Sequence, residues 1–215
     1  MGCAASQANA PAPKISAPPA SDSGSPLPPQ PLVADEHPHA QPVEAIHVDE
    51  ASLQTKTKWD EMGASSLKKA LLDTVMIDAG WLADLADSGD ILPRCQDVPP
   101  EAKVSLTEME AWGDEYTVGV LIISYPWLAK KHPDPHGEQL RKLCFVLKAF
   151  ATKAREYPGC RVGVFWDYLS LPQPNIKGDD DRSPEMIARF KRALQGINAW
   201  YGHQKTTVLL VTTPL

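Results

Sequence analysis

Three short apolar runs constrain the possible folds of this chain more than any other feature of its sequence. They cover residues 117–123, 161–166 and 206–211, and each contains β-branched residues. Continuous runs of this kind are typical of strands buried on both faces of a sheet. Amphipathic stretches over residues 135–154 and 184–201 separate the runs, with apolar residues at helical spacing. This alternation predicts a parallel, three-layer α/β domain with right-handed crossovers.

Capping residues predict where the helices begin. Asp134 is expected to cap the first crossover helix, with the proline that follows it at the first helical position. Ser183 is expected to cap the second crossover helix, and residues 168–182 to form a long polar loop before it. Upstream, residues 65–87 carry an apolar stripe that only Asp78 interrupts, which predicts one continuous helix.

The composition divides the chain into three parts. The first fifty residues contain ten of the 21 prolines and no aromatic residue. Such a segment buries too little apolar surface to offset the entropy of ordering it, so residues 1–58 are expected to be a disordered tether. A helical segment over residues 59–90 and the α/β domain over residues 91–215 are expected to follow. Because the sequence stops directly after the third apolar run, we expect this domain to be incomplete at its C-terminus.

The first residues match a lipidation signal. Met1 is followed by Gly2, Cys3 and, at the required position, Ser6. This pattern predicts N-myristoylation of Gly2 once Met1 is removed. One myristoyl chain binds membranes only reversibly, so a palmitoyl group on Cys3 is expected as the second signal. The sequence therefore predicts a peripheral protein, held by its acyl chains at the cytoplasmic face of a membrane and otherwise cytoplasmic.

Charge and residue spacing argue against several other classes of protein. The formal net charge is −6 and no cluster of Lys and Arg occurs, so nucleic acid is not expected as a partner. The four cysteines show no zinc-binding spacing, and the acidic run at residues 179–181 lacks the pattern of a calcium loop. We therefore expect no metal and no cofactor, and we expect the acidic run to be solvated. The sequence contains neither a glycine-rich phosphate loop nor an apolar run long enough to span a membrane.

Asp167 is the leading candidate for a ligand-binding residue. It directly follows the second apolar run, and open α/β sheets bind ligands at this end of their strands. Alternatively, its carboxylate accepts backbone N–H groups and orders the loop that follows. Tyr125 and Trp127 follow the first run at the same edge, where their rings either stack on a planar ligand or pack in the core. The spacing of polar residues identifies no catalytic set.

Longer motifs resemble those of known families. They are SYPWL at residues 124–128, HPDP at 132–135, LPRCQDVP at 92–99 and VFWDYLSLPQ at 164–173. These motifs are similar to a pattern in families of uncharacterised proteins from algae and other protists. Their order also resembles fungal heterokaryon-incompatibility domains and, more distantly, Toll/interleukin-1 receptor (TIR) domains. The resemblance covers residues 91–215 and implies a flavodoxin-like fold in which Tyr125, Trp127, Asp167 and Gln173 line one edge of the sheet.

The resemblance leads to two functional hypotheses. NAD-cleaving TIR domains rely on a glutamate after the third strand, in a segment that this sequence lacks, so the resemblance supplies no catalytic residue. The first hypothesis is therefore a membrane-tethered signalling or scaffold module that assembles with itself or with protein partners. The alternative is a nucleotide-handling enzyme, of the NAD glycohydrolase type, whose catalytic acid lies beyond the end of the chain.

Overall fold

The computed structural model describes residues 55–175 and 177–212, and the structural statements below refer to these residues. The lipidation residues Gly2 and Cys3 lie outside them, as does the expected tether apart from residues 55–58. The predictions made for the tether and the anchor therefore stay predictions.

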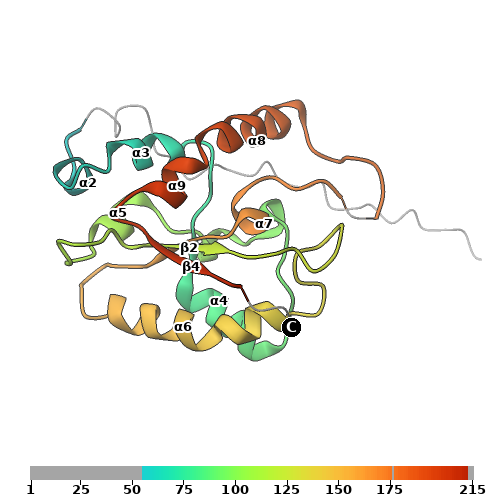
Figure 1. The fold of residues 1–215 in the computed structure, drawn as a ribbon, viewed down its shortest axis with the longest axis horizontal. Helices are drawn as coiled ribbons and strands as arrows, with labels where there is room; N and C mark the ends of the chain where they lie inside the picture. Colours follow the sequence, from blue (N-terminus) through green and yellow to red (C-terminus); the bar gives the residue numbers. More distant parts are fainter. Residues whose placement is uncertain (1–54, 176, 213–215) are drawn as a thin grey trace, which may run out of the picture. The chain divides into compact units, whose positions relative to one another are not determined.

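A four-stranded sheet lies at the centre of the described residues (Figure 1). Its strands are β1 (Ile77–Asp78), β2 (Val120–Ser124), β3 (Gly163–Phe165) and β4 (Thr207–Leu210), in the spatial order β1-β3-β2-β4. β2 is parallel to both β3 and β4, so the three apolar runs form parallel strands as predicted. β1 is antiparallel to β3. The sheet is therefore mixed, and the expectation of a purely parallel sheet is wrong.

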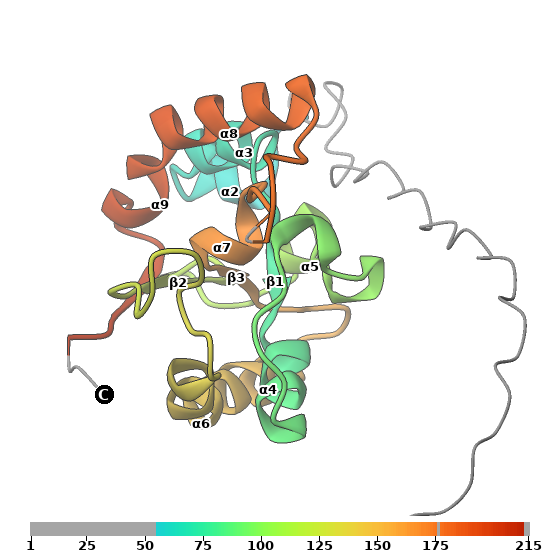
Figure 2. The same ribbon diagram turned by 90° about the vertical axis from the view of Figure 1, so that its right-hand side faces the viewer.

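Helices cover both faces of the sheet and give the expected three layers (Figures 1 and 2). One face is covered by α4 (Ala79–Ser88) and α6 (Glu138–Ala154). The other face is covered by α2 (Lys58–Glu61), α3 (Ser65–Leu71), α8 (Pro184–Gly196) and α9 (Asn198–Gly202). Short helices occupy the connections, namely η1 (Cys95–Asp97), η2 (Pro100–Ala102), α5 (Leu106–Glu110) and α7 (Asp167–Ser170).

The central strand β2 shows why its apolar run is continuous. Leu121 and Ile123 belong to the core that contains buried residues of α4 and α6. Val120 and Ile122 belong to the second core, with buried residues of α3, α8 and α9. Successive side chains of a strand point to opposite faces, so a strand with a core on both sides needs an apolar residue at every position.

The single helix expected over residues 65–87 is wrong, because the structure divides this stretch into α3, β1 and α4. Asp78, which interrupts the apolar stripe, is the N-cap of α4, and its Oδ1 accepts a hydrogen bond from Trp81 N at 2.7 Å. The residue that weakened the helical pattern therefore begins a second helix. Through β1 this segment joins the sheet, and residues 59–90 and the described residues after them belong to one compact unit, Gln41–Leu215.

The start of α6 also differs from expectation. The helix begins at Glu138, and its N-cap residue is Gly137 rather than Asp134. The Asp134 carboxylate nevertheless caps the helix, because it accepts hydrogen bonds from Glu138 N at 2.8 Å and from Leu140 N at 2.9 Å. Asp134 is fully buried, so these bonds replace those that water would make.

The segment between β3 and α8 was expected to be a long loop that ends at a Ser183 cap, and only the cap agrees with this expectation. The loop expected from residue 168 starts later, because α7 follows β3 directly. The cap of the next helix is confirmed, since Ser183 Oγ accepts a hydrogen bond from Met186 N at 3.2 Å.

Candidate functional site

The candidate site lies where β2 and β3 end. Tyr125 directly follows β2, and Asp167 is the first residue of α7, two residues after the end of β3. Because the two strands are parallel neighbours, their carboxyl ends meet at the same edge of the sheet. The fold thus brings together side chains that are 42 residues apart in the sequence.

The Asp167 carboxylate is held by three donors. Its Oδ1 accepts hydrogen bonds from Tyr125 Oη and from Tyr168 N, both at 2.6 Å. Its Oδ2 accepts a hydrogen bond from Trp127 Nε1 at 3.2 Å. A carboxylate oxygen has two lone pairs, so one acceptor direction on Oδ2 is not used by these donors. The structure confirms that Asp167 accepts a backbone N–H group and brings it into contact with Tyr125 and Trp127, and ligand binding by these residues stays a prediction.

Aromatic rings surround this carboxylate. Tyr125 packs edge-on against Trp166, with ring centroids 5.3 Å apart, and Trp127 packs edge-on against Tyr168 at 5.8 Å. Edge-to-face packing of this kind fixes the rings in place. Trp127 is the exposed member of the group, whereas Trp166 and Tyr168 are buried.

The charge of Asp167 acts on two phenols. Burial, together with the negative charge of Asp167, raises the pKa of Tyr125 far above its usual range. Burial and the same charge raise the pKa of Tyr201, on α9, to about 12. Tyrosine hydroxyls are protonated at neutral pH in any case, and these raised pKa values make both groups still poorer bases, so they act as hydrogen-bond donors. No sequence pattern places Tyr201 in the site, since only the packing of α9 brings it near Asp167.

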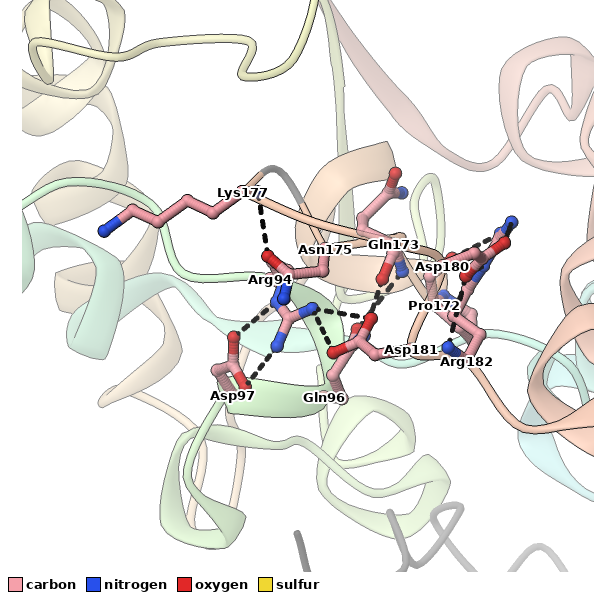
Figure 3. Close-up of polar contacts among 10 residues, drawn as sticks. All are labelled: Arg94, Gln96, Asp97, Pro172, Gln173, Asn175, Lys177, Asp180, Asp181 and Arg182. Atoms are coloured by element: carbon pink, nitrogen blue, oxygen red, sulfur yellow. Dashed lines mark hydrogen bonds and ion pairs between the residues drawn. The ribbon is translucent and has the colours of Figure 1, made fainter. Parts of the chain in front are cut away.

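The side-chain amide of Gln173 bonds to the backbone of α7 and of the turn after it, and does not face the candidate site. Its side chain is buried, and Nε2 donates hydrogen bonds to the backbone carbonyls of Leu171 at 3.0 Å and of Asp167 at 3.3 Å. Its own backbone exchanges two hydrogen bonds with the side-chain amide of Gln96 (Figure 3). Gln173 therefore fixes the turn after α7. It lies next to Asp167, but its side-chain amide is buried.

Ion pairs fasten the loop that follows. Arg94 pairs with Asp97 at 2.7 Å and with Asp181 at 2.8 Å, and Arg182 pairs with Asp180 at 2.7 Å (Figure 3). The acidic run at residues 179–181 was expected to be solvated. It is exposed, but two of its three carboxylates are engaged by arginines.

His132 lies next to the site but has no nitrogen available for chemistry. Asp134 N donates a hydrogen bond to its Nδ1 at 3.0 Å, so Nε2 carries the hydrogen and donates to Leu92 O at 3.0 Å. The ring is buried against Tyr168, with centroids 4.7 Å apart. Its role in this structure is to hold the loop after β2.

Neither a metal site nor a membrane-spanning helix is found among the described residues. They contain no group of three or more His, Cys, Asp or Glu side chains that could hold a metal ion. Among them, no helix combines the length and the apolar character that crossing a bilayer requires. Comparisons of the chain with family models, with curated proteins and with solved structures find no match.

Proposed function

We propose that this chain is a membrane-tethered signalling or scaffold module whose α/β domain acts by associating with a second copy of itself. The tether and the acyl chains on Gly2 and Cys3 are the expected link to the cytoplasmic face of the membrane. The domain itself supplies the surface for assembly.

The open edge of the sheet carries this proposal. Among the described strands, β4 pairs with β2 alone, so none of them lies along the other side of its backbone. Two of its four residues, Val208 and Leu210, are apolar and yet 39% and 68% exposed. Edge strands in proteins that stay monomeric are usually protected by charges, proline or a covering element, and β4 contains neither a charged residue nor proline. Two copies of β4 can pair antiparallel across a two-fold axis.

The candidate site supports binding more than catalysis. Its two phenols have raised pKa values, and the nearby histidine has both nitrogens in hydrogen bonds. A general acid or base needs a pKa near the working pH and an open path to the substrate. A weakly bound planar ligand beside Tyr125, Trp127 and Asp167 remains part of the proposal.

The finer fold assignment is also a proposal. In chain order, the second parallel strand lies on one side of the first and the third lies on the other. This arrangement is the one that flavodoxin-like sheets use for their first three strands, and it supports the resemblance to TIR and heterokaryon-incompatibility domains. The antiparallel β1 is an addition to that pattern.

Sedimentation of the purified chain tests assembly. Val208→Lys/Leu210→Lys should shift the protein from dimer toward monomer, because it places charges on the edge that pairs. Phe145→Lys is the matched control, since Phe145 is an exposed apolar residue on α6. A chain that is monomeric at all concentrations, or a dimer that both changes weaken equally, would contradict the proposal.

Cell fractionation tests the anchor separately. Gly2→Ala removes the acceptor amine and should release the chain into the soluble fraction. Cys3→Ser should leave weak and reversible membrane binding, because one acyl chain is marginal. The lipid-anchor proposal is wrong if the Gly2→Ala chain stays fully in the membrane fraction.

A further inference from the structure

Helices α3, α8 and α9 lie together on one face of the sheet (Figure 2), and a groove of about 180 Å³ lies between them. Half of its lining residues are small, namely Ala70, Ala193, Gly196 and Ala199. An apolar cavity of about 150 Å³ is large enough to hold benzene. The groove, here called the α3–α8 groove, therefore has room for one leucine or isoleucine side chain.

Charged residues line another part of the α3–α8 groove. They are Lys69 of α3, Arg192 of α8 and Asp73, which follows α3. Arg192 pairs with Asp73 at 2.9 Å. Lys69 is exposed, and no ion pair joins it to a described acidic residue. The groove thus offers a positive charge beside its apolar part.

Arg189 adds a buried positive charge one turn before Arg192. It is only 7% exposed, and its Nε donates a hydrogen bond to Asp73 O at 3.1 Å. Within the described part of the chain, its Nη2 has no hydrogen-bond partner. A buried cation without a counter-charge is costly, so a negative charge placed next to α8 here would be stabilising.

The helices that border the groove are positively charged as a group. Together with Asp73 they carry five basic and two acidic residues, which are Lys68, Lys69, Arg189, Lys191 and Arg192 against Asp73 and Glu185. Lys68 is paired with Asp60 of α2, which leaves an excess of two positive charges. In a chain whose formal net charge is −6, this surface favours an acidic occupant.

The chain itself has a segment of matching chemistry next to the groove. Residues 43–53, which lie outside the described residues, read VEAIHVDEASL and combine aliphatic residues with three acidic ones and no lysine or arginine. The described chain starts against α3, because Lys68 Nζ donates a hydrogen bond to Thr55 O at 3.0 Å. An extended chain covers about 3.3–3.6 Å per residue, so a few residues before Thr55 are enough to reach Lys69, the next residue of α3.

We propose that residues 43–53 dock into the α3–α8 groove of their own chain, with one aliphatic side chain among the small residues and the acidic residues beside Lys69 and Arg192. Because the segment is joined to α3, its local concentration at the groove is about millimolar, which favours it over a separate protein of the same chemistry. The contact goes beyond the proposed function, and it would end the tether at residue 42 instead of 58.

Hydrogen exchange of the full chain tests the docking. Gly2→Ala is included so that no acyl chain competes for the groove. Amides of residues 43–53 should exchange at least about tenfold more slowly than those of residues 10–40. Gly196→Trp should abolish this protection, because it fills the groove at a glycine whose Cβ position has open space around it. Gly202→Trp is the matched control, at a second open helical glycine that does not line the groove.

A charge reversal tests the acidic part of the segment. Asp49→Lys/Glu50→Lys should lower the protection roughly tenfold, since two exposed charge pairs become repulsive. The same dipeptide occurs further upstream, and Asp35→Lys/Glu36→Lys should leave the protection unchanged. Added salt should weaken the docking of the unaltered chain, because exposed charges are screened.

Several outcomes would overturn the inference. Residues 43–53 do not dock if they exchange as fast as residues 10–40, if Gly196→Trp leaves their protection unchanged, or if the two charge reversals act equally. Protection that falls on dilution would assign the groove to the segment of a second copy and contradict an intramolecular contact. None of these results depends on acylation or on β4, so a failure here is distinguishable from a failure of the proposed function.

Discussion

Tyr125 Oη donates a hydrogen bond of 2.6 Å to Asp167 Oδ1, joining the carboxyl ends of two neighbouring parallel strands. The donor is mostly buried, and the acceptor is a carboxylate that three donors share. Hydrogen bonds to a charged group are stronger than those between neutral groups. This bond therefore fixes the shape of the candidate site, whichever ligand or partner it serves.

Tyr125→Phe should lower the free energy of unfolding by about 1–2 kcal/mol, because Asp167 loses a donor in partly buried surroundings. Urea unfolding at neutral pH measures this change. Tyr116→Phe removes the hydroxyl of an exposed tyrosine and should change the stability by less than about 0.5 kcal/mol. Equal effects of the two changes would mean that the bond to Asp167 adds no stability.

The purified chain should not release nicotinamide from NAD above the rate without protein, even when concentrated on lipid vesicles. The phenols beside Asp167 are protonated at neutral pH, as ordinary phenols are, and burial with the charge of Asp167 raises their pKa values further, so neither serves as a base. Product analysis by liquid chromatography measures any cleavage. Robust release that Asp167→Asn abolishes would favour the enzyme hypothesis over the scaffold proposal.

Asp60→Asn should destabilise the chain by about 2 kcal/mol at neutral pH, somewhat less than the loss of a fully buried ion pair. Asp60 Oδ2 lies 2.8 Å from the Nζ of Lys68, whose side chain is buried. Hydrogen bonds from Lys68, Ser65 and Thr57 hold the pKa of Asp60 well below its usual range. Urea midpoints at a series of pH values measure the contribution of this carboxylate.

The pH dependence of that contribution has a definite sign. Because the pKa of Asp60 is lower in the folded state, its stabilising effect is complete above the unfolded pKa, about 4, and is lost as the pH falls toward the folded pKa. The difference between wild type and Asp60→Asn should therefore shrink below about pH 4. Asp84→Asn, at an exposed carboxylate on α4, should show no such change.

Gly163→Ala should destabilise the chain by about 1–3 kcal/mol through overpacking. A Cβ at this position of β3 would lie 2.4 Å from Met109 Sδ and 3.0 Å from Met76 Cβ. Gly196→Ala, near the end of α8 with open space around it, should instead stabilise by about 0.5–1 kcal/mol. Thermal unfolding of the two variants measures both changes in stability, and a Gly163→Ala chain as stable as wild type would contradict the packing described for β3.

The parallel part of the fold could be predicted because its signals are local. Each buried strand is a continuous apolar run, and Ser183 precedes its helix with a recognisable cap. β1 could not be predicted, since two residues carry no periodic pattern and their pairing with β3 depends on a distant segment. Because β1 leaves no pattern in the sequence, α3 and α4 on either side of it resembled one continuous helix.

The sequence could predict where the site lies in the sheet, but not which side chains surround Asp167 or how they are hydrogen-bonded. Asp167, Tyr125 and Trp127 follow parallel strands, so their shared edge could be inferred from topology. Gln173 was expected to line that edge, but its amide bonds to backbone carbonyls, a choice that depends on how the turn after α7 folds. Tyr201 has no signal in the sequence, because only the packing of α9 brings it close to Asp167.

The short strand β1 also has a consequence for stoichiometry. Ile77 pairs with Val164 of β3 on one side and forms a bridge with Lys103 on the other, so this edge of the sheet already has a neighbour. Pairing through β4 would then use the only long open edge among the described strands. A molecule that can add a strand at one edge alone forms closed pairs and does not grow into a filament. Assembly through β4 would therefore stop at two copies, and larger clusters on a membrane would have to come from crowding of tethered dimers.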